Sequence, residues 1–259
     1  MNNKIKSVTP SETVEVHLPD GTVLSGLRGT CAGDFLGVVA GSDTAPLMAA
    51  IVNGDLRELT YSIQMEARLA PVTMSDADGA RIYRRSLTFL LSAAFANLFP
   101  GNNMTIDHSV SSGGYFCQVT DRPPLSNVEL DSLDGFMRAW VKKDESFCRQ
   151  EVSLAEAKAY FESKGYHDKV LLLSYRQKDY VTLYQLDDYR DYHQGYMVPS
   201  TGYIKWFEIV PAGDGFILHY LSAPHPPESC PCLNIPSCWL PFANMASGWN
   251  AWESGRSGH

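Results

Sequence analysis

The stretch of residues 80–119 shows the clearest pattern of hydrophobic and polar positions in the chain. Its first half repeats apolar side chains at helical spacing, and Pro100 with Gly101 ends the repeat. The repeated positions are Ile82, Leu87, Leu90, Leu91, Ala94, Phe95 and Leu98. The second half alternates around Met104 and Ile106, breaks at the Gly-rich residues 111–114, and resumes at residues 115–119. The pattern predicts a helix buried on one broad face and a β-hairpin that packs against it.

The residues before this stretch predict a small domain of their own. Residues 13–24 alternate on both sides of the turn signal Pro19-Asp20-Gly21, which is typical of a hairpin. Residues 30–39 can form a short helix, and residues 45–52 form a strand that enters a tight turn at Asn53-Gly54. The order strand, strand, helix, strand, turn is that of a β-grasp domain.

The residues after the central stretch predict two more helices and a sheet. Residues 125–143 repeat apolar positions at helical spacing, with Ser126 or Asn127 as the N-cap. Ser153-Leu154-Ala155-Glu156 is a capping box that opens a second helix, which Gly165 ends. From Val170 onward the runs LLLSY, YVTLYQL, YIKWFEIV and GFILHYL favour strands of a mostly antiparallel sheet. After Pro227 the sequence shows neither helical spacing nor strand alternation of its apolar residues.

Composition limits the possible classes of protein. A chain of 259 residues with 44% hydrophobic content can bury a core and has room for two domains. The sequence has neither an apolar run of transmembrane length nor an apolar signal segment at its start, so we expect a cytoplasmic protein. Its six cysteines are then expected to be free thiols. The net charge of −8 argues against an extensive surface that tracks phosphates, although it leaves room for a local basic patch.

Several phrases resemble parts of threonyl-tRNA synthetases. The segments VEVHLPDG, IVNG and ARLAPV, within residues 12–77, resemble a TGS domain, and the central helix and hairpin resemble the opening of the synthetase's second domain, which alanyl-type editing proteins share. The resemblance implies an α+β fold. A β-grasp TGS domain (residues 1–77) would precede a threonyl/alanyl-tRNA synthetase editing-like domain with an antiparallel sheet (78–227) and an irregular tail (228–259).

The ligand residues of that family are largely absent from this sequence. The family's helix carries an HxxxH pair, and the resemblance puts Arg85 and Phe89 at those two positions. In the later segment that resembles Cys-x-x-x-His, His193 stands at the Cys position and Met197 at the His position. A zinc site needs three or four ligands. We therefore expect no metal.

The phrase from Gly195 to Glu208, with GFIL after it, resembles bacterial nucleoside (uridine) kinase-like proteins, in which TGS and synthetase-like domains precede a kinase domain. With that comparison the likeness extends over residues 12 to about 227. No GxxxxGK[ST] segment occurs in the sequence, so the backbone nest and the Lys that hold triphosphates in P-loop enzymes have no candidate here. ATP and Mg²⁺ are expected only for the kinase domain, which would normally stand in cis. We hypothesise that the tail comes from a frameshift that truncated a longer protein.

Six residues are candidates for contacts with a ligand. Arg85, beside Arg84, is expected to face the cleft and to hold a phosphate or carboxylate, with a surface salt bridge as the alternative. His108 and His193 are weak candidates for a general base, against structural roles. The other three candidates are Tyr115, Tyr196 and Lys205.

Aromatic and thiol side chains add further alternatives. Tyr115 and Tyr196, with Tyr203 and Trp206, could line a pocket for a nucleobase or an adenosine end, but aromatics in strands are more often core. Cys117 is more simply a buried inert thiol than a nucleophile. The set His225, Cys230, Cys232 and Cys238 matches no standard zinc spacing. The carboxylates of Asp187, Asp188 and Asp191 could bind a cation or form a solvated turn.

From the sequence we therefore expect a binding or regulatory region without catalysis, part of a nucleoside kinase-like protein. Its partners would be a small molecule, a nucleotide or the acceptor end of a tRNA, with neither membrane nor DNA. Two alternatives stay open: a freestanding aminoacyl-tRNA deacylase that uses His108 and His193, and a structural module that docks a partner.

Overall fold

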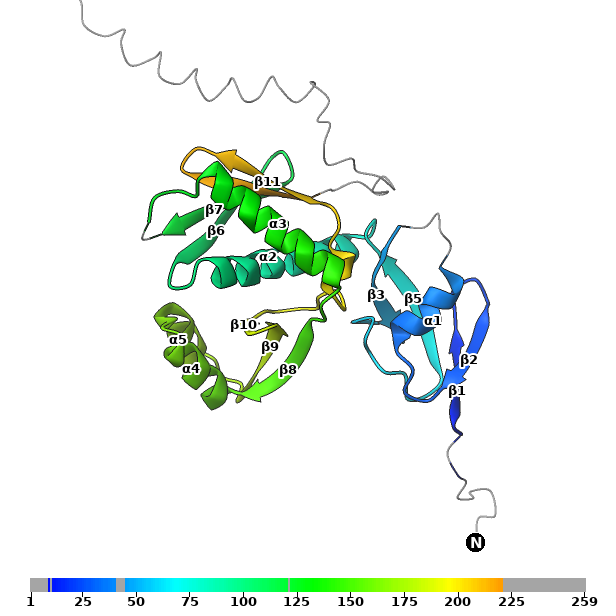
Figure 1. The fold of residues 1–259 in the computed structure, drawn as a ribbon. Coiled ribbons are helices and arrows are strands. Elements are labelled where there is room, and N and C mark those ends of the chain that lie inside the picture. The colour runs from blue at the N-terminus through cyan, green and yellow to red at the C-terminus, as the bar shows by residue number, and fades with distance from the viewer. Residues whose placement is uncertain (1–8, 10, 41–44, 121, 221–259) are drawn as a thin grey trace, which may run out of the picture. The chain divides into compact units, whose positions relative to one another are not determined.

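The computed structural model of the chain describes residues 9, 11–40, 45–120 and 122–220 (Figure 1). These residues form one compact α+β unit with three sheets. The predicted tail, residues 228–259, and the candidate zinc set within and near it lie outside the described residues. In the described part of the chain, no helix combines the length and the apolar character that a membrane span requires.

The first sheet has five strands in the order β2-β1-β5-β3-β4. Its elements are β1 (Thr13–His17), β2 (Val23–Leu27), α1 (Ala32–Val39), β3 (Leu47–Val52), β4 (Asp55–Arg57) and β5 (Ala67–Thr73). β1 and β5 pair in parallel, and the other pairs are antiparallel. The predicted turn is confirmed, because Asn53 and Gly54 both have positive φ, at 53° and 93°, as a two-residue hairpin turn requires.

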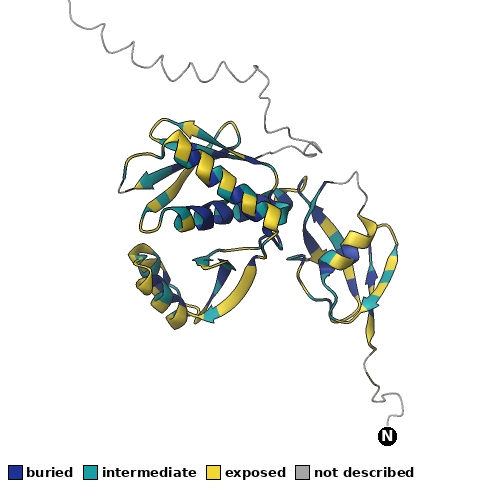
Figure 2. Cartoon of the chain, viewed as in Figure 1, coloured by how far each residue is buried: buried dark blue, intermediate teal, exposed yellow. Residues whose placement is uncertain are grey.

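The predicted central helix is α2 (Ala77–Leu98), which begins three residues earlier than the apolar pattern. Its buried face includes Ile82, Leu87 and Phe89 and carries the main hydrophobic core (Figure 2). Gly79 is required near its start, because a Cβ there would lie 1.8 Å from the carbonyl oxygen of Thr73. α2 contacts both of the remaining sheets, and so it can place side chains between them.

The second sheet contains the predicted hairpin, in the order β11-β12-β7-β6 and entirely antiparallel. Its strands are β6 (Asn103–Val110), β7 (Gly114–Thr120), β11 (Phe207–Ala212) and β12 (Gly215–Tyr220). α3 (Asn127–Lys143) contacts α2 and β11. Its N-cap is Ser126, whose side chain and that of Glu129 form the full reciprocal capping box.

The third sheet has the order β10-β9-β8 and packs with two short helices. The elements are β8 (Cys148–Ser153), α4 (Leu154–Ser163), α5 (His167–Ser174), β9 (Tyr180–Leu186) and β10 (Tyr189–Tyr192), with the 3-10 turn η1 (Thr201–Tyr203) after them. Ser153 caps α4 through a hydroxyl that accepts a bond from the Glu156 amide, which is one half of the predicted capping box. The prediction of a strand at LLLSY was wrong, because residues 170–174 belong to α5 and only Leu173 of that helix is buried. A short apolar run fits either a strand or one face of a short helix.

Candidate functional site

The four positions that the resemblance assigned to the family's ligands come together between α2 and the segment of residues 193–198. Phe89 is fully buried, and its ring lies edge-on to His193 with centroids 5.4 Å apart. Rings of Phe147, Tyr184 and Tyr189 also surround Phe89, and Met197 is buried in the same core. Aromatic and aliphatic side chains therefore fill the place where the family has imidazoles.

Arg85 fastens α2 to this segment. Its Nη1 donates a hydrogen bond of 2.5 Å to the carbonyl oxygen of Tyr196, and a Cβ on Gly195 would lie 2.8 Å from the guanidinium carbon. One residue further along α2, the buried hydroxyl of Ser86 accepts a bond of 3.0 Å from the Val198 amide. These two contacts hold the segment against the helix.

Burial shifts the pKa of two groups here. It lowers the pKa of the half-buried Arg85 guanidinium, and the charge of Arg81 adds to this effect. An arginine still remains charged at neutral pH. Burial likewise lowers the pKa of His193 from its ordinary 6.5, against the opposing effect of Asp191. The neutral imidazole is therefore favoured at neutral pH.

The residues around this cluster do not fit a cation. Among the described residues, no group of three or more His, Cys, Asp or Glu side chains is placed to hold a metal ion. Asp191 is already engaged, since its carboxylate accepts bonds from Lys169 Nζ at 2.7 Å and from the Tyr189 hydroxyl at 2.9 Å. Asp187 and Asp188 are exposed, and Asp187 has a φ of 52°, which is a turn conformation.

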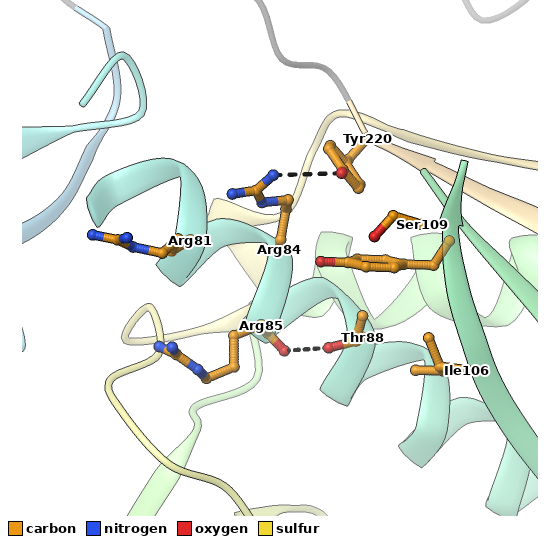
Figure 3. A pocket seen from close by; sticks show the side chains of 8 residues that line it. Arg81, Arg84, Arg85, Thr88, Ile106, Ser109 and Tyr220 are labelled. Carbon is orange, nitrogen blue, oxygen red and sulfur yellow. Dashed lines mark hydrogen bonds between the residues drawn. The ribbon is translucent and has the colours of Figure 1, made fainter. Parts of the chain in front are cut away.

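On one side of Arg85 lies an open cavity of about 510 Å³, which we call the arginine pocket (Figure 3). Its lining residues are Arg81, Arg84, Arg85, Thr88, Ile106, Ser109, Tyr115 and Tyr220. Among the described residues, no Asp or Glu lines this pocket. The arginines at positions 81, 84 and 85 share one face of α2, because residues three and four apart on a helix are neighbours.

Arg84 is the arginine best placed to meet a ligand in this pocket. Its guanidinium lies 5.2 Å from the centre of the Tyr220 ring, and Nη1 is 3.4 Å from the Tyr220 hydroxyl. Figure 3 shows Arg84 directed toward Tyr220, whereas Arg85 extends away from it. Tyr115 stands beside Tyr220, with ring centroids 5.4 Å apart, and burial raises the pKa of its hydroxyl. The hydroxyl of Tyr115 is therefore neutral and can donate.

On the other side of the 193–196 segment lies a larger cavity of about 750 Å³, which we call the tyrosine pocket. His193, Gly195 and Tyr196 line it. The single cleft expected between α2, the hairpin and the His193 segment is thus divided, because Arg85 and its contacts with Gly195 and Tyr196 stand between the two cavities.

The six candidate ligand residues are distributed unevenly. Arg85 and Tyr115 line the arginine pocket, and His193 and Tyr196 line the tyrosine pocket. His108 lines neither: it is exposed on β6, and its Nδ1 lies 2.9 Å from a carboxylate oxygen of the adjacent Asp107. Lys205 is exposed and lines neither pocket.

The other aromatic and thiol candidates belong to the interior. The Tyr83 hydroxyl donates to the Trp206 carbonyl oxygen and accepts from the Trp206 amide, so Trp206 is engaged in packing. Tyr203 is half-buried against the core. Cys117 is fully buried, and burial raises the pKa of its thiol to about 12, which supports the inert thiol.

Sequence reasoning missed Arg81 and Tyr220, and it missed Arg149, Arg176 and Lys178, which line the tyrosine pocket. The signal for Arg81 was present, because its spacing from Arg84 and Arg85 places all three on one helical face. Tyr220 gave no such signal. It reaches the pocket only through the pairing of β12 with β7, which joins residues about a hundred positions apart.

Comparisons with known proteins agree with the synthetase part of this interpretation. No protein-family profile matches the chain. The chain is similar to the threonine–tRNA ligase of Burkholderia lata, with 32% identity over 198 residues, and to that of Symbiobacterium thermophilum, with 29% over 201 residues. These matches cover 76% and 77% of this chain but only 31% of each ligase. The threonine–tRNA ligase of Rickettsia bellii is 27% identical over 198 residues. The chain therefore contains a threonyl-tRNA synthetase-like region and spans about a third of the length of these relatives.

Proposed function

We propose that this chain binds the unpaired 3′ end of a tRNA acceptor stem in the arginine pocket and does not hydrolyse the bond to an attached amino acid. The observation that carries the proposal is the arrangement of Arg84 over Tyr220 beside Tyr115, in a pocket lined by three arginines and no carboxylate of the described chain. Arginine and aromatic rings together suit the phosphates and bases of a single strand. The relatives supply the class of RNA, since each is named a threonine–tRNA ligase.

The charge of the chain limits the size of the RNA footprint. With a net charge of −8, the protein as a whole repels RNA, and only a local basic site can attract it. Each phosphate contact to a single strand contributes about 0.7 to the slope of log affinity against log salt concentration. We therefore expect a slope of about 1 to 2, which corresponds to contacts with the end of the strand only.

The exchanged family positions explain why we propose binding without hydrolysis. Arg85 is held by the Tyr196 carbonyl, Phe89 is packed among rings, and Met197 is buried. None of these side chains can activate water or take up a proton at neutral pH. The groove thus keeps a cationic surface for the RNA end but has no general base at these three positions.

The test is RNA binding measured by fluorescence anisotropy with a labelled acceptor-stem minihelix that ends in an unpaired CCA. We expect Arg84→Ala to weaken binding about tenfold, since it removes one charge-assisted phosphate contact. Lys142→Ala on α3 is the matched control: it removes the same charge from an exposed position that lines neither pocket. Equal affinities of the two variants would reject the proposal.

A deacylase is the second candidate, and one observation favours it. His193 is neutral, lies in the segment that resembles the family's site and lines a cavity. A neutral imidazole can act as a general base for water. Mischarged tRNA incubated with the chain would be deacylated, and His193→Ala would abolish this activity. If the wild-type chain leaves the ester of mischarged tRNA intact, the deacylase function is rejected and the proposal of binding without hydrolysis stands.

Two finer assignments also belong to this proposal. The five-stranded sheet with α1 would be the TGS-type β-grasp domain, since β1, β2, α1 and β3 follow one another in the predicted β-grasp order. The relatives reported above give the nucleoside kinase link no support and favour a tRNA-related domain. ATP-dependent phosphorylation of uridine by the purified chain would reverse this preference.

A further inference from the structure

The tyrosine pocket gathers cationic side chains from separate parts of the third sheet. Arg149 comes from β8, and Arg176 and Lys178 come from the connection between α5 and β9. No Asp or Glu among the residues that the structure describes lines this pocket. Three cations around one cavity are unexpected in a chain with a net charge of −8, and they call for an anionic ligand.

Two of these cations are positioned by rings of the pocket itself. Arg176 donates from Nε to the Tyr180 carbonyl at 3.1 Å and from Nη1 to the Tyr192 hydroxyl at 2.9 Å, and its guanidinium lies 5.4 Å from the Tyr192 ring centre. The guanidinium carbon of Arg149 lies 5.9 Å from the Tyr196 ring centre, and its Nη2 forms an ion pair with Glu151 Oε1 at 3.2 Å. A guanidinium held in this way is organised before a ligand arrives, which lowers the entropic cost of binding.

Lys178 supplies the least committed charge. Its Nζ lies 5.7 Å from the Tyr180 ring centre, and among the described residues it forms no ion pair. It is exposed at the rim of the cavity. A lysine in this position can turn toward a phosphate without breaking another bond.

We infer that the tyrosine pocket binds a nucleoside phosphate. The cations suit a phosphate group, the rings of Tyr192 and Tyr196 suit a base, and the amides of Gln177 and Gln194 can each donate and accept at a base edge. The volume of about 750 Å³ lies within the range of pockets that hold small ligands. A simple carboxylate would leave most of these groups without a partner.

This site is separate from the arginine pocket and goes beyond the proposed function. The contacts of Arg85 with Gly195 and Tyr196 stand between the two cavities, and the basic residues of the tyrosine pocket do not line the arginine pocket. The nucleotide could be a free molecule or the terminal nucleotide of an RNA, because both present the same phosphate and base.

The test is isothermal titration of the full chain with AMP, adenosine and inorganic phosphate. AMP should bind saturably, adenosine at least about tenfold more weakly, and phosphate should compete with AMP. Lys178→Gln should weaken AMP binding about tenfold, and Arg176→Ala should do the same. Arg176 also has structural contacts, so the Arg176→Ala variant can lose its fold. In that case the result for the exposed Lys178→Gln variant carries the test. Lys142→Ala is the charge-matched control.

A trinucleotide CpCpA distinguishes the two sources. Tighter binding of AMP than of CpCpA identifies a free nucleotide. Tighter binding of CpCpA, with the same dependence on Lys178, identifies an RNA terminus; it supports this site but contradicts the placement of the RNA end in the arginine pocket. The inference is overturned if AMP does not bind, if Lys178→Gln binds AMP as Lys142→Ala does, or if AMP binding is lost in Arg84→Ala instead. Failure of AMP to bind would leave minihelix binding unaffected. Failure of the wild-type chain to bind the minihelix would likewise leave the AMP result unaffected.

Discussion

The guanidinium of Arg85 donates a 2.5 Å hydrogen bond to the main-chain carbonyl of Tyr196. This bond joins α2 to the segment that resembles the family's Cys-x-x-x-His, and it lies where the family has a histidine. A charged donor to a carbonyl is one of the stronger hydrogen bonds in proteins. Arg85 therefore stabilises the local structure and separates the arginine pocket from the tyrosine pocket.

Replacement of Arg85 should destabilise the protein. Arg85→Met keeps much of the side-chain volume but leaves the Tyr196 carbonyl without this donor, which should reduce the free energy of unfolding by about 1–3 kcal/mol. Urea denaturation followed by circular dichroism measures the change. Arg81→Met is the control, since Arg81 is exposed and its ion-pair partner is Asp78 within the same helix. Equal stability of the two variants would show that the bond does not hold the segment.

Gly195 should tolerate no side chain. Its φ is 93°, and an added Cβ would approach the Arg85 guanidinium to 2.8 Å. Gly54 has the same φ of 93° but open space where its Cβ would be, so it separates backbone strain from the contact with Arg85. We expect Gly195→Ala to lower the free energy of unfolding, measured by thermal denaturation, by about 1 kcal/mol or more beyond the loss in Gly54→Ala. Identical losses of stability in the two variants would show that backbone strain alone causes the destabilisation.

His193 should make the stability of the protein sensitive to mild acid. Burial lowers its pKa in the folded state below the ordinary 6.5, so the unfolded chain takes up the proton first. Its contribution to stability is complete above pH 6.5 and is lost as the pH falls through the folded-state pKa. The free energy of unfolding, measured from pH 7.5 to about 5, should therefore decline more in the wild type than in His193→Gln. Parallel curves would exclude this linkage.

The thiols of Cys117 and Cys148 should differ in reactivity. Cys117 is fully buried with a pKa of about 12, whereas Cys148 is exposed on β8. Only the thiolate is alkylated, so iodoacetamide at pH 8 should modify Cys148 at least about a hundredfold faster than Cys117 in the folded chain. Mass spectrometry of the peptides gives both rates, and denaturation in urea should make them similar. Rapid modification of native Cys117 would contradict the buried position.

Local patterns in the sequence were sufficient to predict the elements that carry most of the fold. The apolar repeat of α2, the Gly-rich hairpin turn and the Ser126 cap each depend on residues within a few positions of one another. α5 was missed because its apolar residues point partly to solvent: Leu171 is 57% and Leu172 is 60% exposed. A run of exposed leucines in a short helix has the composition of a strand.

The site was less accessible to sequence reasoning because its parts are distant in the chain. The resemblance identified Arg85, Phe89, His193 and Met197 as neighbours, and the structure brings the segments that carry them together. It could not show that Arg85 would divide the cleft. Arg149 and Arg176 meet only because β8 pairs with β9, and no local pattern announces that pairing.

The most direct measurement of the central claim compares two RNAs on the wild-type chain: an acceptor-stem minihelix with its unpaired CCA end and the same stem with that end removed. If the arginine pocket holds the end of the strand, removal of the CCA should weaken binding at least about tenfold, because stacking on the tyrosines and phosphate contacts are both lost. Equal affinity for the two RNAs would contradict the account.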